Sequence, residues 1–316
     1  MNSKMVVAII LSTFNSSFAQ VSEQWVMSTL QQYAPTSYYI VHQYKLNGSS
    51  ISFDNRSISS GMSHMEFCDM SSKRRFLSTI STTVHETTHA LDSQIPFMFA
   101  KQGIYKMDNS DNEGFIFDQN YKTAYTFPKS KLFQSRKLST VIPQNLRTFR
   151  YDTYIESKSD NQSTQRSGVI GLMEEFNAYY QGSKVIFDLL PIYKDELGNN
   201  FLWAWSSDFT SNADAFYEFD FFIKEYLMYS KTNNLELYEE LKKDENFKSI
   251  YKNIRSRFQN LITQYEKKYD EFTLTAQKNN GIIYSSKKHS DLIFPILSEQ
   301  IKSAKYKEIE TLFLGK

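Results

Sequence analysis

The chain has 316 residues, 41% of them hydrophobic, and its 36 Lys and Arg residues nearly balance its 35 Asp and Glu residues. A net charge of +1 argues against a broad nucleic-acid-binding surface and against an electrostatic membrane anchor, so we expect no nucleic-acid partner. This length is enough to bury one sizeable core and to carry a helical appendage.

The first 19 residues have the order of a secretory signal peptide. Lys4 lies in a short polar start, an apolar run follows from Met5 to Leu11, and small residues end at Ala19. The run is too short to span a bilayer, and no later stretch of the sequence reaches that length. We expect cleavage after Ala19 and a secreted or periplasmic mature chain without a membrane span; a buried N-terminal helix is the alternative. The single cysteine, Cys68, excludes an intramolecular disulfide.

The region after residue 37 is rich in β-formers. Residues 38–46 and 51–58 alternate between apolar and polar side chains, with Asn47 and Gly48 at a turn between them. We predict two strands here and a further extended segment at 62–68.

The period of the hydrophobic pattern changes between residues 71 and 94. Phe76, Ile80 and Val84 recur at a spacing of four, which predicts a helix that Pro96 ends. The run TISTTV is β-branched and by propensity alone favours a strand. Its spacing and length favour a buried helix instead.

Extended segments and then helices fill the rest of the sequence. Residues 97–150 read as extended segments separated by polar turns, and the last of these segments is the run LRTFRYDTYI at 146–155. Residues 169–190 form a second helical run that stops at Pro191. Beyond it the patterns are almost entirely helical. We therefore predict an α+β fold with a core in residues 20–190, containing a mixed β-sheet and two helices, and a mainly α-helical subdomain in residues 191–316.

The first of these helices contains the run His85-Glu86-Thr-Thr-His89. Residues i and i+4 lie on one helical face, so both imidazoles can direct a nitrogen at one metal ion about 2 Å away. Glu86 is placed beside them, where it can act as the general base for a zinc-activated water. The pattern predicts a catalytic zinc site. The alternatives are two histidines packed in a core and a zinc site without catalysis.

This run resembles the active helix of the zincin metallopeptidases. Extended through Ala90 to Asp92, it is similar to the lethal-factor-like and related gluzincin branches. Asp92 and Ile95 stand where metzincins carry a glycine and a third histidine, which excludes that branch. The resemblance covers one helix and a downstream ligand helix, and it implies a zincin-like core, peptide-bond hydrolysis and a glutamate as third zinc ligand.

The best position for that glutamate is the second helix. Glu175 shares a helical face with Leu172, Phe176 and Tyr179, the face that we expect to be buried. Glu174 points about 100° away from Glu175. The spacing of Glu175 and Ala178 also resembles the ligand helix of several gluzincins. We favour Glu175 as the ligand and keep Glu174 as the alternative, or as a group that supports a ligand or binds substrate. Two solvent-facing acids remain the third interpretation.

Two further roles stay open. Asp92 either accepts the second imidazole hydrogen of a ligand or faces water at the helix end. The resemblance also implies a side chain that stabilises the oxyanion beside zinc. Tyr154 and Tyr179 are our candidates for this catalytic role, Tyr151 lies near them in the sequence, and His289 is a remote option.

Together these patterns predict an exported zinc-dependent metallopeptidase with a peptide or protein substrate. His85, His89 and Glu175 would bind Zn²⁺, and Glu86 would be the general base. The main alternative is a non-hydrolytic zincin-fold protein that serves as a binding or interaction module. A purely helical interaction protein is the third class, and it predicts no metal.

Overall fold

The computed structural model describes residues 20–107, 111–278 and 295–316, and in them a mainly helical, broadly α+β fold. In chain order its helices and strands are α1 (Glu23–Tyr33), α2 (Pro35–Asn47), β1 (Ser50–Phe53), β2 (Arg56–Ser59), α3 (Lys73–Lys101), β3 (Asp111–Asp118), β4 (Tyr121–Phe127), α4 (Phe149–Tyr154), α5 (Ser163–Arg166), α6 (Gly168–Asp188), α7 (Leu190–Leu197), α8 (Phe201–Ala213), α9 (Ala215–Asn233), α10 (Leu235–Lys243), α11 (Glu245–Lys278), α12 (Pro295–Gln300) and α13 (Lys307–Leu314).

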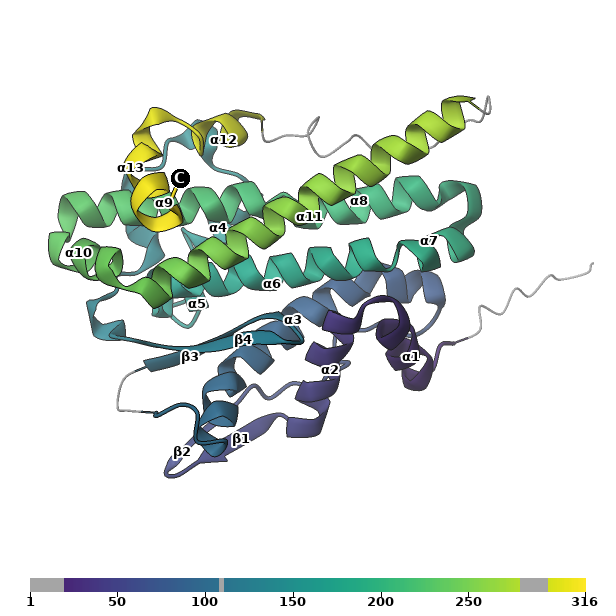
Figure 1. Ribbon diagram of the computed structural model, residues 1–316, viewed down its shortest axis with the longest axis horizontal. Helices are drawn as coiled ribbons and strands as arrows, with labels where there is room; N and C mark the ends of the chain where they lie inside the picture. The colour runs from purple at the N-terminus through teal and green to yellow at the C-terminus, as the bar shows by residue number, and fades with distance from the viewer. Residues whose placement is uncertain (1–19, 108–110, 279–294) are drawn as a thin grey trace, which may run out of the picture.

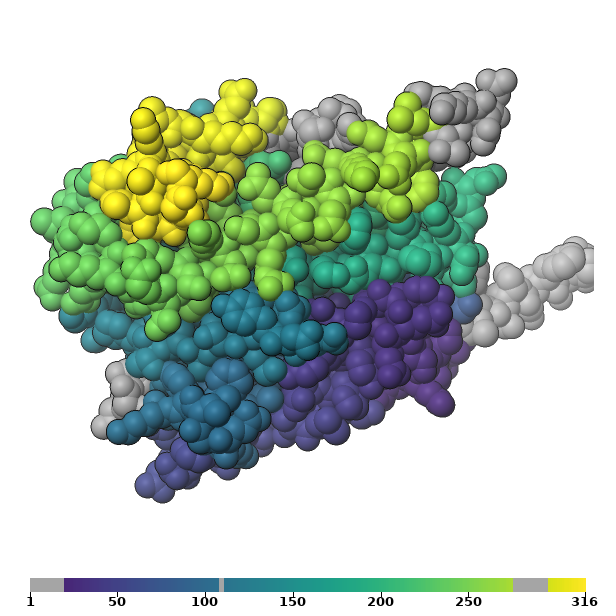
Figure 2. Space-filling view, in the orientation of Figure 1, coloured from purple at the N-terminus to yellow at the C-terminus, as the bar shows by residue number. Residues whose placement is uncertain are grey.

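Helices α3 and α6 lie against each other at the centre of the molecule (Figure 1). The long helices α8, α9 and α11 pack on α6 on one side, while α1, α2 and both hairpins lie on the α3 side. Figure 2 shows the same division on the surface, with the C-terminal helices covering one half and the N-terminal segments the other. The face shared by α3 and α6 is therefore covered from both sides.

Helix α2 occupies the segment for which the sequence predicted a first strand. Pro35 stands at its first turn, a position where the missing N–H costs no hydrogen bond, and Gly48 with φ 75° ends it. Ile40, Val41 and Tyr44 are buried at helical spacing. The strand prediction for residues 38–46 was wrong because these apolar residues fit a helical face as well as an alternating pattern.

The predicted second strand is itself a hairpin. Ser50 pairs with Ser59 and Phe53 with Arg56, and Asp54, with φ 51°, makes the tight turn between β1 and β2. Residues 62–68, predicted as extended, contain turns instead of a strand.

Helix α3 forms where the four-residue spacing predicted it. Ser72 caps its start, since its Oγ accepts a hydrogen bond from the Arg75 N–H at 3.2 Å. Two threonines of the run TISTTV, which favoured a strand by propensity, donate their hydroxyls to carbonyls one turn back: Thr79 to Arg75 at 3.0 Å and Thr83 to Thr79 at 3.1 Å. Burial of the apolar face outweighs the local preference of the β-branched residues.

Pro96 lies inside α3 and does not end it, so the predicted stop was wrong. Proline removes the N–H that would bond the carbonyl of Asp92, four residues back. Gly114 of β3 is pressed against this carbonyl, because a Cβ built on Gly114 would lie 2.3 Å from that oxygen. Buried Phe97 and Ala100 hold the helix together beyond the proline.

Strands β3 and β4 form an antiparallel hairpin within the region predicted as extended. The edge of β3 that faces the helices is satisfied by side chains. Asp92 accepts from the Ile116 N–H at 2.9 Å, while Asn177 and Gln181 donate to the Ile116 carbonyl at 3.0 and 2.8 Å. A sheet edge buried against helices needs such partners.

The predicted mixed sheet is not found in the described residues, whose strands form two separate antiparallel pairs. Residues 149–154, predicted as extended, form helix α4. The rest of the segment between β4 and α5 consists of short 3₁₀ turns and irregular structure. The coarse α+β prediction is confirmed.

Helix α6 follows the prediction closely, spanning Gly168–Asp188. Two glycines let other backbones approach it. A Cβ on Gly171 would lie 2.2 Å from the Ser163 carbonyl of α5, and one on Gly182 would lie 3.2 Å from the Ser81 carbonyl of α3. These close approaches place α5 and α3 along the helix that carries Glu174 and Glu175.

The helices beyond residue 190 share one buried apolar cluster with the segments before it. Phe176 and Tyr180 of α6 contact Phe258 of α11 at ring distances of 5.7 and 5.8 Å. The predicted division of the chain at residue 191 stays a prediction. In the described part of the chain, no helix combines the length and apolarity that crossing a membrane requires.

Candidate metal centre

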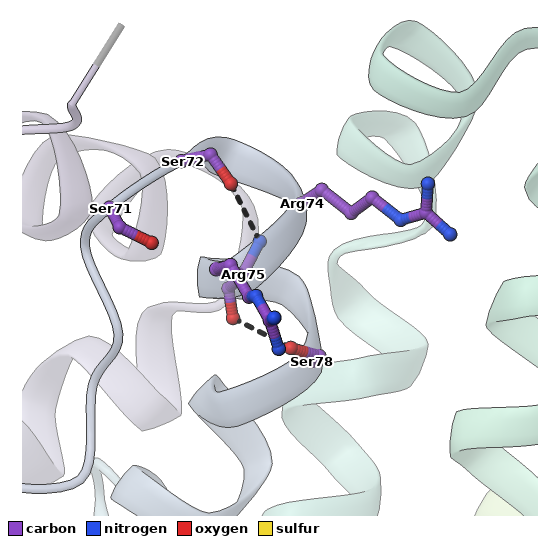
Figure 3. Close-up of a pocket in the computed structure, with 5 residues that line it drawn as sticks. All are labelled: Ser71, Ser72, Arg74, Arg75 and Ser78. Atoms are coloured by element: carbon purple, nitrogen blue, oxygen red, sulfur yellow. Dashed lines mark hydrogen bonds between the residues drawn. The ribbon is translucent and has the colours of Figure 1, made fainter. Parts of the chain in front are cut away.

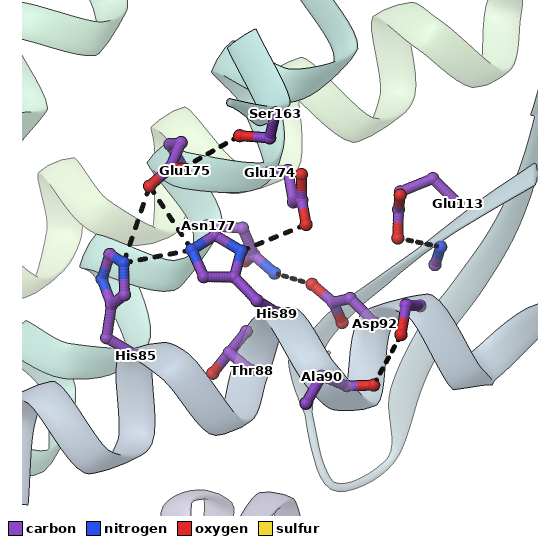
Figure 4. Close-up of polar contacts among 12 residues, drawn as sticks. His85, Thr88, His89, Ala90, Asp92, Glu113, Ser163, Glu174, Glu175 and Asn177 are labelled. Carbon is purple, nitrogen blue, oxygen red and sulfur yellow. Dashed lines mark hydrogen bonds and ion pairs between the residues drawn. The ribbon is translucent and has the colours of Figure 1, made fainter. Parts of the chain in front are cut away.

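Three side chains from α3 and α6 converge between the two helices (Figure 4). The Nε2 atoms of His85 and His89 are 3.1 Å apart, and Glu175 Oε2 lies 3.6 Å from the first and 3.4 Å from the second. A metal ion about 2.0–2.1 Å from three tetrahedral ligands keeps them about 3.3–3.4 Å apart. The triangle therefore has the size that a zinc ion needs, and it is the only such cluster found in the described residues.

The Glu175 carboxylate is oriented by one oxygen and left open at the other. Ser163 Oγ of α5 donates to Oε1 at 3.0 Å. Oε2 is buried, faces the two imidazoles and receives no hydrogen bond from the described residues. A buried carboxylate oxygen without a donor is unfavourable unless something else compensates it. A bound cation would do so, and the residues therefore fit a metal.

Glu174 supports His89 from behind. Its Oε1 lies 3.1 Å from His89 Nδ1, and the side chain is nearly buried. An N–H on Nδ1 that donates to this carboxylate leaves Nε2 free to face the triangle. Of the two glutamates left open by the sequence, Glu175 is in the triangle and Glu174 orients a histidine.

The charges in the cluster favour one proton on His89. Burial of this imidazole opposes its charge, but the carboxylates of Glu175 and Glu174 outweigh burial and hold the pKa of His89 well above its usual value. Burial would raise the pKa of Glu175, but His89 and His85 hold it below its usual value. A metal ion must displace the proton on His89, because only the neutral imidazole binds it.

Glu86 lies on α3 directly after His85 and is partly exposed. No hydrogen bond or ion pair engages its carboxylate among the residues that the structure describes. An uncommitted carboxylate next to a metal site is available to a water molecule or a substrate group.

Asp92 matches neither interpretation drawn from the sequence. It is fully buried, so it does not face water, and its oxygens bind the Ile116 N–H at 2.9 Å and the Asn177 amide at 3.1 Å instead of an imidazole. Burial raises the pKa of Asp92 well above its usual value. Its role is to attach β3 and α6 to α3, and the support of the histidine falls to Glu174.

Tyr154 and Tyr179 lie together beside His85. Their hydroxyl oxygens are 3.0 Å apart, and the Tyr179 ring meets the His85 ring edge-on with centroids 4.5 Å apart. Burial, together with the nearby negative charge of Glu175, raises the pKa of Tyr154, so this phenol keeps its proton. Tyr151 does not take part in this pair, because its hydroxyl donates to Glu156 at 2.9 Å. His289 lies outside the described residues.

Several residues that build the site gave no signal in the sequence. Ser163 lies in a polar stretch without a pattern, and Asn177 is one of many polar residues on a helix. Arg150, whose guanidinium lies 4.5 Å from the centre of the Tyr179 ring, comes from a segment predicted as extended. Their proximity to the triangle depends on the packing of α4, α5 and α6.

A separate hollow lies at the start of α3 (Figure 3). It is lined by Ser71, Ser72, Arg74, Arg75 and Ser78. A helix rises 1.5 Å per residue, so along the axis of α3 Arg74 lies about 16 Å and Ser78 about 10 Å from His85. The lining offers no carboxylate or imidazole, and the hollow takes no part in the candidate metal centre.

Fold and site together define an α+β protein with a buried cluster of two histidines and one glutamate suited to a metal ion. Comparison of the chain with protein-family models, with curated proteins and with solved structures finds no match.

Proposed function

We propose that this protein is a zinc-dependent metallopeptidase, with a zincin-like arrangement of active helix α3 and ligand helix α6. The observation that supports this proposal best is the triangle of His85, His89 and Glu175, with the unpartnered Glu175 oxygen directed into it. The triangle leaves one tetrahedral position open, which is a property of catalytic rather than structural zinc sites.

Zinc bound here would supply a Lewis acid and an activated water at neutral pH. The chain's own residues would do the rest. Glu86 accepts the proton of the attacking water and passes it to the leaving amine. Glu174 keeps His89 in the tautomer that presents Nε2, and Ser163 keeps the Glu175 carboxylate turned toward the histidines.

The substrate class and cellular location follow from chemistry and from the N-terminal pattern. A general base beside an electrophilic metal suits hydrolysis of a peptide bond, so we propose a peptide or protein substrate. The order of residues 1–19, which lie outside the described residues, supports export, so we propose a secreted or periplasmic enzyme.

The test combines metal analysis with a peptidase assay on a broad peptide library. We expect one zinc per chain and hydrolysis that a chelator abolishes and added zinc restores. Glu86→Gln should retain the zinc and lose activity by at least about a hundredfold, because removal of a general base costs about 10²–10⁴ in rate. His85→Ala, as the comparison variant, should lose both.

Two results would contradict the proposal. Full activity of Glu86→Gln would show that another group is the base. Stoichiometric zinc without hydrolysis of any library peptide by the wild type would favour a non-hydrolytic binding protein.

A further inference from the structure

Side chains from α4 and α6 pack beside His85, next to the metal triangle. Tyr179 follows Glu175 by four residues, one turn along the same face of α6, and its ring contacts the His85 ring. Tyr154 of α4 places its hydroxyl 3.0 Å from that of Tyr179. The two phenols therefore border the metal triangle on the side of His85.

Arg150 holds this pair from the other side. Its guanidinium lies 4.5 Å from the centre of the Tyr179 ring, and the residue is only 4% exposed. Arg150 Nη1 donates to Glu218 at 2.5 Å, and Nη2 donates to the Ser211 carbonyl at 2.7 Å. A buried, doubly anchored guanidinium is rigid, so the face it presents to Tyr179 is fixed.

Glu218 ties this arrangement to α9. It is fully buried, accepts from Arg150 and also from the Thr148 hydroxyl. Arg150 thus links α8 and α9 to the side chains around the triangle.

The phenol pair has one proton to spare. Two hydroxyls that bond each other use one O–H between them, and neither Tyr154 nor Tyr179 has another acceptor among the described residues. A spare O–H next to an electropositive guanidinium is a good hydrogen-bond donor to developing negative charge. A misplaced donor would lose most of this effect, because such stabilisation depends on preorganised geometry.

We propose that Arg150 is a positioning residue of this site: it fixes Tyr179 against His85 and Tyr154, so that the spare phenol proton is presented to the carbonyl oxygen of a bound substrate. This inference rests on the proposed peptidase function. It assigns a role in the reaction to Arg150 of α4, which Glu218 of α9 anchors. The motif on α3 does not reveal this role.

The experiment uses the zinc-loaded full chain and four variants. Tyr179→Phe removes only a hydroxyl and keeps the ring on His85. Arg150→Lys keeps a charge for Glu218 and loses the planar contact with Tyr179. The double variant combines them, and Tyr180→Phe removes a buried phenol hydroxyl on the face of α6 toward Phe258 as the matched control. The readouts are kcat and KM for the best library peptide, the affinity for its phosphinic analogue by calorimetry, and the zinc affinity.

We expect Tyr179→Phe and Arg150→Lys each to lower kcat and the phosphinic-analogue affinity by roughly tenfold to a hundredfold, as loss of a hydrogen bond to a charged group does. KM and zinc affinity should stay near wild type. The double variant should lose little more than either single variant, because both act through one donor. Tyr180→Phe should match the wild type.

Wild-type kcat and analogue affinity in Arg150→Lys would overturn the inference, as would losses that add in the double variant. Should Arg150→Lys fail to fold, Glu218→Gln makes the same comparison, since it loosens the anchor and leaves Arg150 in place. A wild-type protein that binds zinc and hydrolyses nothing would overturn the proposed function and this inference together. If the wild type hydrolyses peptides but the variants do not show the expected losses, only this inference is overturned.

Discussion

The Glu175 carboxylate divides its two oxygens between different partners. One is held by Ser163, and the other faces two imidazole nitrogens without a donor. Its neighbour Glu174 lies on the far side of His89, with Oε1 3.1 Å from Nδ1. Adjacent glutamates on one helix thus have different roles, because successive side chains point about 100° apart.

Alanine substitutions at the two glutamates should separate these roles. We expect Glu174→Ala to weaken zinc binding by about 10–100-fold, the usual effect of losing a group that orients a ligand. Glu175→Ala should abolish stoichiometric zinc, since it removes a ligand. Competition with a chromogenic chelator measures both, and the reverse order would show that Glu174 is the ligand.

Zinc affinity should depend on pH through His89. The pKa of His89 is raised well above its usual value by the two carboxylates, so at neutral pH the metal-free site holds a proton that zinc must displace. Affinity should therefore fall as pH falls, by about tenfold per unit below this raised pKa. Chelator competition between about pH 6 and 8 tests this, and a flat profile would show that no proton is displaced.

Sequence reasoning found the three residues of the candidate metal centre but did not find the side chains that orient them. His85, His89 and Glu175 could be placed by helical spacing, which is a local property. The assignment of Asp92 failed because its partners, Ile116 and Asn177, come from distant segments. No local pattern reports such a contact.

Glycines on α6 decide how closely its neighbours approach. At Gly171 the backbone of α5 lies where a side chain would be, and α5 carries the Ser163 that orients Glu175. At Gly182 the neighbours are the Asn212 amide nitrogen at 3.1 Å and a carbonyl of α3 at 3.2 Å, both farther away than the carbonyl 2.2 Å from Gly171. The contact of Gly171 with the α5 backbone therefore has much less room for an added Cβ.

Gly171→Ala and Gly182→Ala form a matched pair on one helix. Both gain up to about 1 kcal/mol of helix propensity. Gly171→Ala must push α5 away, so we expect its free energy of unfolding to fall by roughly 1–3 kcal/mol, with weaker zinc binding. Gly182→Ala should stay within about 1 kcal/mol of wild type and bind zinc normally. Urea denaturation and chelator competition measure the two effects; equal behaviour would contradict the proposed role of the α5 contact.

The elements that were predicted wrongly share one cause. Residues 38–46 and 149–154 are short segments whose apolar residues suit either a strand or a helix, and burial against neighbours selected the helix. Pro96 was expected to end α3, but packing of the residues beyond it outweighs one lost hydrogen bond. Long periodic helices such as α6 left no such ambiguity.

Across the whole molecule, charged groups buried between helices tie the C-terminus to the rest. Lys224 of α9 is fully buried and donates to the Ile301 carbonyl at 2.7 Å, and it pairs with Asp220 and with Glu310 of α13. Arg255 of α11 donates to Asp220 at 2.8 Å. Removal of one member takes a partner away from buried charges that remain in place.

Lys224→Met should lower the free energy of unfolding by roughly 3–5 kcal/mol, since Asp220 and Glu310 each lose one buried partner and the Ile301 carbonyl loses its donor. Lys231→Met is the matched control on the same helix, because Lys231 pairs with Glu308 at the surface. Its effect should not exceed about 1 kcal/mol. Urea denaturation compares the two, and similar losses would show that burial of the network is unimportant.

Local spacing along the chain was sufficient for the two central helices, the histidine pair, the general-base candidate and the favoured third ligand, because an α-helix converts sequence distance directly into a face. The separate hairpins, the continuation of α3 past Pro96 and the role of Asp92 came only from the folded chain. So did the contacts of Ser163 with Glu175 and of Arg150 with Tyr179. Each depends on contacts between residues far apart in sequence, which form when apolar faces are buried together and which no short stretch encodes.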